Sequence, residues 1–197
     1  MKVTRLELDG LILVEISIRG DERGFFAERF KHSAFRELGL PCDFRQDNHS
    51  RSAPGVLRGL HYQSNPPQGK LVGVTRGRIW DVAVDIRPHS KTFGRSHHLE
   101  LSDVNGRLLW IPPGFAHGFC VVGDEPADVY YKVDQDYNPA GEGGILWSDP
   151  ELAIPWPIGD PVVSIKDGAL QDFAEYRARP AEWRRGPEFY EEPVVEV

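Results

Sequence analysis

The stretch GVLRGLHYQSNPPQGKLVGV, from Gly55 to Val74, predicts two strands joined by a turn. Apolar residues recur along both of its ends, and the central SNPPQG carries the prolines and the glycine of a turn. The same stretch holds three ionisable side chains, those of Arg58, His61 and Lys70. Strands that only build a core do not normally carry three such groups in so short a run. The stretch therefore indicates both a strand-rich fold and a reactive site.

The same alternation of short strand-like runs and turn signals continues on both sides of this stretch. With about ten such runs and little helix between them, the pattern favours an antiparallel sandwich or barrel, an all-β fold. We expect one short helix at "AFREL", capped by Ser33 and ended by Gly39. A second helix is predicted to start near Asp167 and to end at Pro180. We expect a single domain over residues 1–197, with a peripheral C-terminal segment from about residue 168.

Composition narrows the classes of function. The formal net charge of −7 is the reverse of what a nucleic-acid binder usually carries. Only two cysteines occur, Cys42 and Cys120, and they fit a reducing cytoplasm better than a disulfide framework. No apolar run approaches the length of a membrane span, and the first residues lack the apolar core of a signal peptide. We therefore expect a cytoplasmic protein that binds neither nucleic acid nor membrane.

Two histidines raise the question of a metal site. His61 in "GLHYQ" and His117 in "PPGFAH" lie on separate predicted strands, and the PxGxxH spacing resembles the second motif of cupins. A metal-binding cupin usually has a second histidine two residues after the first and a carboxylate further on. This chain has Gln63 and Lys70 in that region, and a cation there would repel a dication. We therefore expect a cupin-like barrel without a metal.

Organic acid–base chemistry remains. His61 can act as a general base because its pKa lies near neutrality. A carboxylate would orient it, with Asp167, Asp81 and Asp85 as the candidates. Tyr130 or Tyr131 could donate a proton from the opposite side of a substrate. Lys70 or Arg58 could stabilise an oxyanion, a set that suits proton removal next to a carbonyl.

Strand alternation makes two further predictions. Strict period two puts Arg58 and His61 on opposite faces, and Gly59 between them would permit a bulge that brings both inward. Gln46 and Asn48 lie two apart and therefore share one face of a strand.

A family resemblance rests on the strings GDERGFFAERF, QDNHS, GVLRGLHYQ, PPQGKLV, DVAVDIRPHSKTFG, LWIPPGFAHGF, YYKVDQDYNP, WSDP and SIKD. In order and spacing, roughly residues 1 to 170 resemble the dTDP-4-dehydrorhamnose 3,5-epimerase family. The resemblance implies a metal-free, cupin-like jelly roll with a few short helices, and a homodimer. It also implies epimerisation of dTDP-4-dehydro-6-deoxy-D-glucose at C3 and C5. No redox change occurs in that reaction, so no cofactor is expected.

The resemblance also implies roles for individual residues. His61 would be the base, Asp167 its supporting carboxylate and Tyr131 the acid, with Lys70 near the C4 oxygen. Nucleotide or substrate contacts fall on Arg23, Phe26, Glu28, Gln46, Asp47, Asn48, Arg58, His117, Tyr137, Glu142 and Lys166.

One position departs from the family pattern, and three other functions compete. Gly73 stands where many members of the family have arginine. Relatives that invert only C3 or only C5 carry almost the same residues, so a 3- or 5-monoepimerase on a related dTDP-4-keto-6-deoxy sugar is the alternative. A non-catalytic nucleotide-sugar binding module could dispense with His61, Tyr131 and Asp167, all of which are present. A metal-dependent cupin oxygenase would need the ligands that Gln63 and Lys70 replace.

Overall fold

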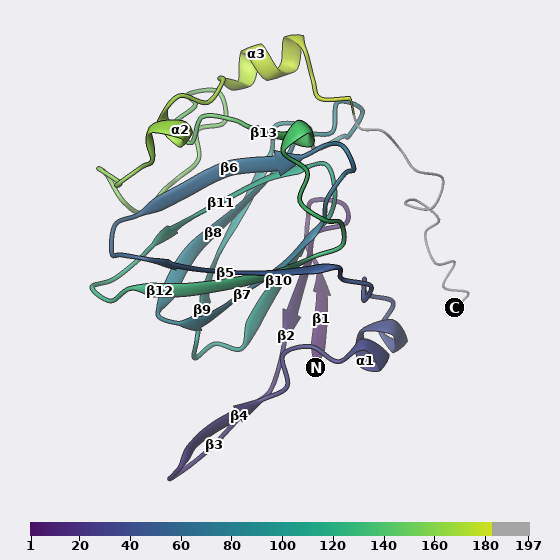
Figure 1. Cartoon of the computed structure of the whole chain (residues 1–197), viewed down its shortest axis with the longest axis vertical. Coiled ribbons are helices and arrows are strands. Elements are labelled where there is room, and N and C mark those ends of the chain that lie inside the picture. Colours follow the sequence, from purple (N-terminus) through teal and green to yellow (C-terminus); the bar gives the residue numbers. More distant parts are fainter. Residues whose placement is uncertain (183–197) are drawn as a thin grey trace.

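The structure is a computed structural model, and it describes residues 1–182 of the chain. Figure 1 shows two facing sheets, a separate hairpin and a few short helices. The helices are α1 (His32–Glu37), α2 (Ile165–Gly168) and α3 (Phe173–Ala178), with a 3-10 turn at Pro139–Gly141. The strands are β1 (Lys2–Arg5), β2 (Ile12–Glu15), β3 (Ile18–Asp21), β4 (Gly24–Ala27), β5 (Gln46–Ser52), β6 (Leu57–Gln63), β7 (Lys70–Arg76), β8 (Arg78–Asp85), β9 (Ser96–Ser102), β10 (Arg107–Ile111), β11 (Phe115–Val121), β12 (Ala127–Val133) and β13 (Glu142–Gly144).

The two large sheets are antiparallel throughout. One has six strands in the order β1-β2-β10-β7-β12-β5, and the other has five in the order β13-β6-β11-β8-β9. Two such sheets packed face to face form the framework of a jelly roll. The predicted all-β class, with a few short helices mostly towards the C-terminus, is confirmed.

The core lies between the two sheets. Ile79 and Ala83 of β8 face inward and are fully buried, together with Val72 of β7 and Val129 of β12 from the other sheet. Because side chains alternate along a strand, Asp81 shares this inward face with Ile79 and Ala83. A carboxylate thus lies between two apolar residues of this row.

Both outer faces are covered in part. On the five-stranded sheet, Leu60 and Val82 pack in a cluster with Phe173 and Tyr176 of α3. On the six-stranded sheet, α1 contributes Phe35 to a cluster with residues of β2 and β10.

Strand β6 departs from regular pairing at Gly59. Its register with β11 shifts just after His117, where β11 lies opposite Arg58 and His61. Gly59 has a φ of 117°, and a Cβ there would lie 2.6 Å from the Gly118 Cα, so only glycine fits. The predicted irregularity is confirmed, and Arg58 and His61 both line one cavity.

Helix α1 is where sequence predicted it, but its cap is different. The N-cap residue is Lys31, whose side chain makes no capping hydrogen bond, and Ser33 lies inside the helix. The prediction of Ser33 as the cap is therefore wrong. Gly39 follows the helix with a φ of 65°, the left-handed conformation that favours glycine at this position.

The C-terminal helix is divided in two, so the prediction of one helix from near Asp167 to Pro180 is wrong. Ser164 caps α2 and Asp172 caps α3, each accepting a backbone N–H bond three residues on. Between them, the Leu146 N–H donates to the Gln171 carbonyl, which ties this segment to the chain beside the five-stranded sheet. Tyr176 of α3 is fully buried. The rest of the predicted peripheral segment, from residue 183, lies outside the described residues.

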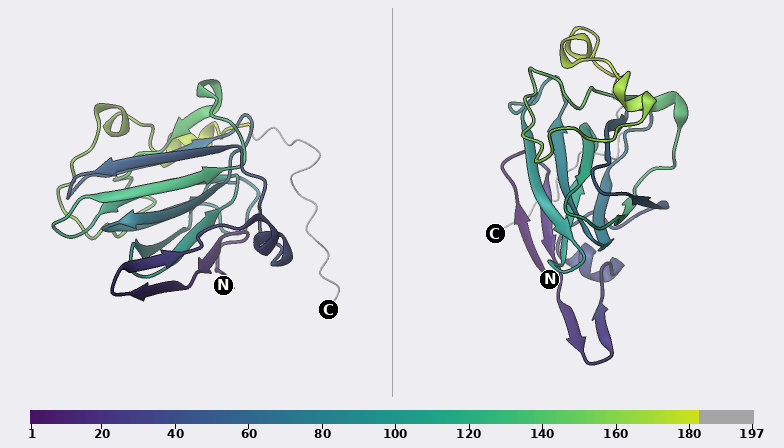
Figure 2. Two further views of the ribbon diagram at one scale, coloured as in Figure 1. Left: turned by 60° about the horizontal axis from the view of Figure 1, so that its bottom comes forward. Right: turned by 90° about the vertical axis from the view of Figure 1, so that its left-hand side faces the viewer.

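The hairpin of β3 and β4 projects away from the two sheets, as Figure 2 shows. Its Phe25 and Phe26 side chains are 60% and 70% exposed. Aromatic side chains of this size are normally covered. Over residues 1–182, no helix has the length and apolar character needed to cross a membrane.

Candidate active site

A cavity of about 500 Å³ lies between the two sheets. Its walls include seven of the residues predicted from the sequence: Arg58, His61, Lys70, His117, Tyr131, Lys166 and Asp167. The other lining residues are Ser50, Val56, Leu57, Gly118, Phe119, Val162, Val163 and Ser164. The predicted convergence of His61, Lys70, His117 and Tyr131 on one cavity is confirmed.

His61 and Asp167 form a histidine–carboxylate pair. The His61 Nε2 lies 2.8 Å from Asp167 Oδ1, and the Gly59 N–H donates to Asp167 Oδ2 at 3.1 Å. The Ser164 hydroxyl accepts the backbone N–H of Asp167 at 3.0 Å, which caps the helix that carries this carboxylate. An ionised carboxylate only accepts, so Nε2 carries the hydrogen and Nδ1 is left to act as a base. Of the three carboxylates left open by the sequence, Asp167 is the partner of His61.

The surroundings of His61 favour its neutral form. Burial is the main cause that lowers the pKa of His61, and the Lys70 ammonium adds to it. Asp167 opposes both by its hydrogen bond and its charge, and the net direction is still downward. A neutral imidazole can take a proton near pH 7, whereas an imidazolium cannot.

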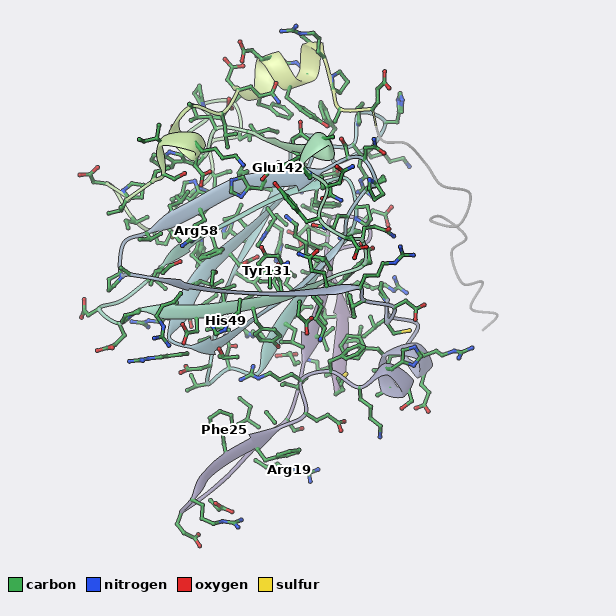
Figure 3. All side chains as sticks on the ribbon, viewed as in Figure 1. Arg19, Phe25, His49, Arg58, Tyr131 and Glu142 are labelled. Carbon is green, nitrogen blue, oxygen red and sulfur yellow. The ribbon has the colours of Figure 1, made fainter. Side chains whose placement is uncertain are left out.

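Tyr131 reaches the cavity from the opposite sheet. It lies on β12, and His61 lies on β6. Burial is the main cause that raises the pKa of Tyr131, and Glu142 adds to it against the opposing charge of Arg58. The phenol therefore keeps its proton at neutral pH. Figure 3 shows Tyr131 between the sheets, with Arg58 and Glu142 on the side of the five-stranded sheet.

Tyr130, the other tyrosine that sequence left open, points out of the sheet. It packs in the cluster around α1, under the guanidinium of Arg29 at 5.6 Å. Its ring occupies the space beside Gly73, where a Cβ would lie 2.7 Å from the Tyr130 Oη. The glycine at this position is thus matched to Tyr130 on the outer face of the sheet.

Lys70 stands at the start of β7, and its Nζ donates to the His61 carbonyl at 3.3 Å. Burial lowers the pKa of Lys70 to about 8, while the charges of Asp81 and Glu142 raise it. The side chain is therefore mostly an ammonium at pH 7, and a hydrogen-bond donor for an oxyanion.

His117 has its own carboxylate. Its Nε2 lies 2.8 Å from Asp81 Oδ2, and Asp81 is fully buried. Sequence left Asp81 open only as a partner of His61, so its link to His117 was missed. The signal available in the sequence was an aspartate between two apolar residues, Ile79 and Ala83, on the same face of a strand. Asp85, the third candidate, binds Arg87 at the end of β8.

A hydrogen-bonded chain runs from the cavity to the edge strand β5. Lys166 Nζ donates to Glu142 Oε2 at 2.8 Å, and the Tyr137 hydroxyl donates to the same oxygen at 2.9 Å. The Tyr137 N–H donates to the Gln46 side chain, which in turn donates to Asn48 Oδ1. Burial raises the pKa of Glu142, but the bonds from Lys166 and Tyr137 outweigh it and the net direction is downward.

Eight predicted contact residues do not line the cavity. Gln46, Asn48, Tyr137 and Glu142 are joined to its wall through the hydrogen-bonded chain from Lys166, and the other four are outside that chain. Asp47 lies on the outward face of β5, where Lys132 Nζ binds it at 2.8 Å. Arg23, Phe26 and Glu28 belong to the hairpin or the residues just after it, and Arg23 is paired with Asp21. Figure 3 shows the labelled hairpin residue Phe25 well apart from Tyr131. The roles of these four residues stay predictions.

Gln63 and the groups able to share a metal ion bear on the metal question that the sequence raised. Gln63, which stands where a cupin ligand is expected, donates to the Pro66 and Asp136 carbonyls and holds two loops together. Within residues 1–182, the group of metal-type donors that lies close enough to share an ion is away from the cavity. It consists of His32, Cys42 and Asp43, at and beyond α1.

Comparisons with known proteins agree on one family. The family model described as dTDP-4-dehydrorhamnose 3,5-epimerase matches residues 5–175. The dTDP-4-dehydrorhamnose 3,5-epimerase of Shigella flexneri is 50% identical over 177 residues, which is 89% of this chain and 97% of that protein.

Solved structures share the fold. The dTDP-6-deoxy-D-glucose-3,5-epimerase of Legionella pneumophila, in complex with dTDP-4-keto-L-rhamnose, superposes with a TM-score of 0.87 at 46% identity. That match covers 94% of this chain and 99% of the other. A 3'-monoepimerase from Streptomyces bikiniensis, in complex with dTDP-quinovose, has a TM-score of 0.82 at 32% identity, covering 88% of each chain. The family model and these identities confirm the resemblance found in the sequence: the chain belongs to the dTDP-4-dehydrorhamnose 3,5-epimerase family.

Proposed function

We propose that this protein epimerises dTDP-4-dehydro-6-deoxy-D-glucose at C3 and C5, giving dTDP-4-dehydro-L-rhamnose. The observation that carries the proposal is the placement of His61 and Tyr131. They enter one cavity from facing sheets, so a sugar ring between them would meet a base on one face and an acid on the other. Membership of the family supports the choice of substrate.

The reaction follows from the acidity of the hydrogens next to the C4 ketone. His61, held neutral by its surroundings, takes the proton from C3 or C5 through Nδ1. The electrons of the broken C–H bond form the enolate, whose charge rests on the C4 oxygen. Lys70 donates a hydrogen bond to that oxygen. Tyr131 then gives its proton to the same carbon from the opposite face, which inverts the centre.

Each group returns to its starting state by exchange with water. The Tyr131 phenolate regains a proton, and His61 releases the one it took. No electron is gained or lost by the sugar, so the proposed reaction includes no redox partner. Two such cycles, one at each carbon next to the ketone, complete the epimerisation.

The nucleotide diphosphate would extend from the sugar towards β5. Arg58 and Lys166 line the cavity and are cations suited to phosphate oxygens. Gln46, Asn48 and Tyr137 continue in the same direction through their hydrogen-bonded chain. Tyr137 is 54% exposed, and its ring would stack on the thymine.

We also infer that the protein works as a homodimer in which the hairpin of one copy completes the cavity of the other. Arg23, Phe26 and Glu28 do not line the cavity of their own chain, and Phe25 and Phe26 are exposed. Strand β5, which carries Gln46 and Asn48, is the edge of its sheet and leaves one side open to another strand. In this dimer the hairpin of the second copy would lie against the open side of β5.

The cytoplasm is the compartment that we propose. Cys42 and Cys120 are both free in the structure, as they would remain in a reducing environment.

The test is incubation with dTDP-4-dehydro-6-deoxy-D-glucose in heavy water, followed by proton NMR. Deuterium at both C3 and C5, with inverted configuration at both carbons, supports the proposal. Similarity to the monoepimerase of Streptomyces bikiniensis makes inversion at C3 alone the second candidate. Exchange can outrun net inversion, so the ring coupling constants of the product must be measured as well as the deuterium content.

A further inference from the structure

Asp81 is a buried carboxylate that does not line the cavity and has no role in the proposed reaction. None of its surface is exposed, and it lies between Ile79 and Ala83 in the inward row of β8. Its Oδ2 lies 2.8 Å from His117 Nε2, while its Oδ1 has no hydrogen-bond partner in the part of the chain that the structure describes. A half-satisfied buried carboxylate is unfavourable for stability, so its presence requires another explanation.

The two cavity residues that interact with Asp81 give that explanation. His117 binds Asp81 directly, and both His117 and Lys70 line the cavity. Asp81 is the first of the charges that favour the ammonium form of Lys70 against burial, and Glu142 is the second. Asp81 thus contacts one cavity side chain, His117, and its charge favours the ammonium form of another, Lys70, while it remains behind the cavity wall.

We propose that Asp81 is a positioning residue for the epimerisation, which keeps Lys70 charged and fixes the ring of His117. The inference rests on the proposed function and deepens it. Since Nε2 of His117 is bound to Asp81, Nδ1 is the nitrogen left for a ligand in the cavity. A sugar or phosphate group therefore meets this ring in one tautomer and one orientation.

The charges around Lys70 differ in how they would respond to a substrate. Facing it are His61 of β6, Asp81 of β8, His117 of β11, Tyr131 of β12 and Glu142 of β13. Of the two carboxylates, Glu142 is already bound to Lys166 and Tyr137, next to the proposed nucleotide path. Asp81 is sealed behind the wall, so its charge stays in place when a ligand enters. It is the permanent counter-charge of the ammonium that holds the enolate.

The variant Asp81→Asn tests this without removing volume or the hydrogen bond, because an amide oxygen can still accept from His117 Nε2. Only the negative charge is lost. Loss of a nearby opposite charge disfavours the ammonium, so the pKa of Lys70 should move down by about one pH unit or more. The readout is competitive labelling of amines with acetic anhydride over a pH series. The acetylated Lys70 peptide is quantified by mass spectrometry. The alkaline limb of kcat/KM should move in the same direction.

Asp85→Asn is the matched control. Asp85 is also a fully buried carboxylate on β8, but it binds Arg87, Ser90 and Thr92 at the strand end. Its loss should leave the labelling curve of Lys70 unchanged. An unchanged Lys70 curve in Asp81→Asn overturns the inference.

Labelling needs no substrate, so the two proposals can fail separately. A shifted Lys70 curve in a protein that exchanges no sugar proton would overturn the proposed function and leave the charge coupling standing. Should Asp81→Asn fail to fold, ¹⁵N NMR of wild-type His117 decides. A hydrogen on Nε2 supports the inference, and a hydrogen on Nδ1 with a bare Nε2 overturns it.

Discussion

His61 and His117 are paired across the neighbouring strands β6 and β11, and each uses Nε2 to bind a buried carboxylate. Both rings therefore present Nδ1 as their remaining nitrogen. Both histidines lie on the sheet that faces Tyr131. Of their two carboxylates, Asp167 also accepts a backbone N–H, that of Gly59, whereas the second oxygen of Asp81 has no hydrogen-bond partner within residues 1–182. The two histidine–carboxylate pairs are alike in form, and in our proposal one carries the proton while the other holds substrate.

His61→Ala should abolish deuterium exchange at both C3 and C5, because no enolate forms without the base. The expected loss is on the order of a hundred- to ten-thousandfold. The measurement is NMR of the C3 and C5 protons in heavy water. His49→Ala is the control, since His49 is exposed on the outer face of β5 and should keep the wild-type rate. Exchange at the wild-type rate in His61→Ala would refute the mechanism.

Tyr131→Phe should reduce net epimerisation more than exchange. The enolate still forms, and His61 can return a solvent-derived proton to the original face. Comparing deuterium content with product configuration in the same NMR samples separates the two effects. Tyr130→Phe is the matched control, because Tyr130 directly precedes Tyr131 and points to the outer face of the sheet, away from the cavity. Equal losses of exchange and epimerisation in Tyr131→Phe would contradict an acid role.

The pH profile of kcat/KM should be bell-shaped. On the acid side activity falls as His61 becomes protonated, and its lowered pKa places that limb below the usual range of histidine. On the alkaline side it falls as Lys70, with a pKa of about 8, loses its proton. Asp167→Asn removes a charge that raises the pKa of His61, so the acid limb should move to lower pH. The maximal rate should fall as well, since an amide supports an imidazolium poorly. An acid limb that stays in place would contradict the pairing.

Mixed dimers test whether the hairpin serves a second copy. His61→Ala and Phe26→Ala should each be weakly active alone. After mixing, unfolding and refolding together, one cavity of each hybrid would combine an intact His61 with an intact partner hairpin, and activity should return. A mixture of His61→Ala and Asp167→Asn should gain no activity over the two variants measured separately, because every cavity keeps one defect. Recovery in neither mixture would place the hairpin outside the active site.

Gly73→Ala should destabilise the fold by about 1–3 kcal/mol, the usual range for overpacking. The added methyl would meet Leu108 Cδ2 and Tyr130 Oη, each at 2.7 Å. In a Tyr130→Ala background the penalty should shrink, because part of the obstructing ring is gone. Urea denaturation of the single and double variants gives the comparison. A penalty of the same size in both backgrounds would show that Tyr130 does not set the limit.

Sequence predicted the strands and the inward residues well where alternation was regular. Gln46 and Asn48 share a face as expected, and the same rule puts Asp47 outside, although the family resemblance had grouped the three. Alternation failed at Gly59, where the absence of a Cβ gave the clue to the irregularity. Local pattern and positional resemblance thus lead to different expectations for Asp47.

The choice among carboxylates could not be made from local sequence. Asp81, Asp85 and Asp167 are all buried, and only the packing of α2 against β6 decides which one meets His61. The break between α2 and α3 was missed partly for a similar reason. The cap at Asp172 is a local signal that the prediction of one helix overlooked, whereas the hydrogen bond from the Leu146 N–H to the Gln171 carbonyl is a tertiary feature that helix propensity does not contain.

The two hydrogen bonds of the Asp167 side chain affect how the orientation of the His61 ring is maintained. One of its oxygens holds the His61 ring, and the other holds the backbone N–H of Gly59, two residues earlier on the same strand. If α2 shifts, ring and strand are pulled together, so the angle of the imidazole to its own backbone is preserved. Relative motion of the two sheets would then change the distance from the sugar carbon to His61 Nδ1, while the direction from which the proton is taken stays constant.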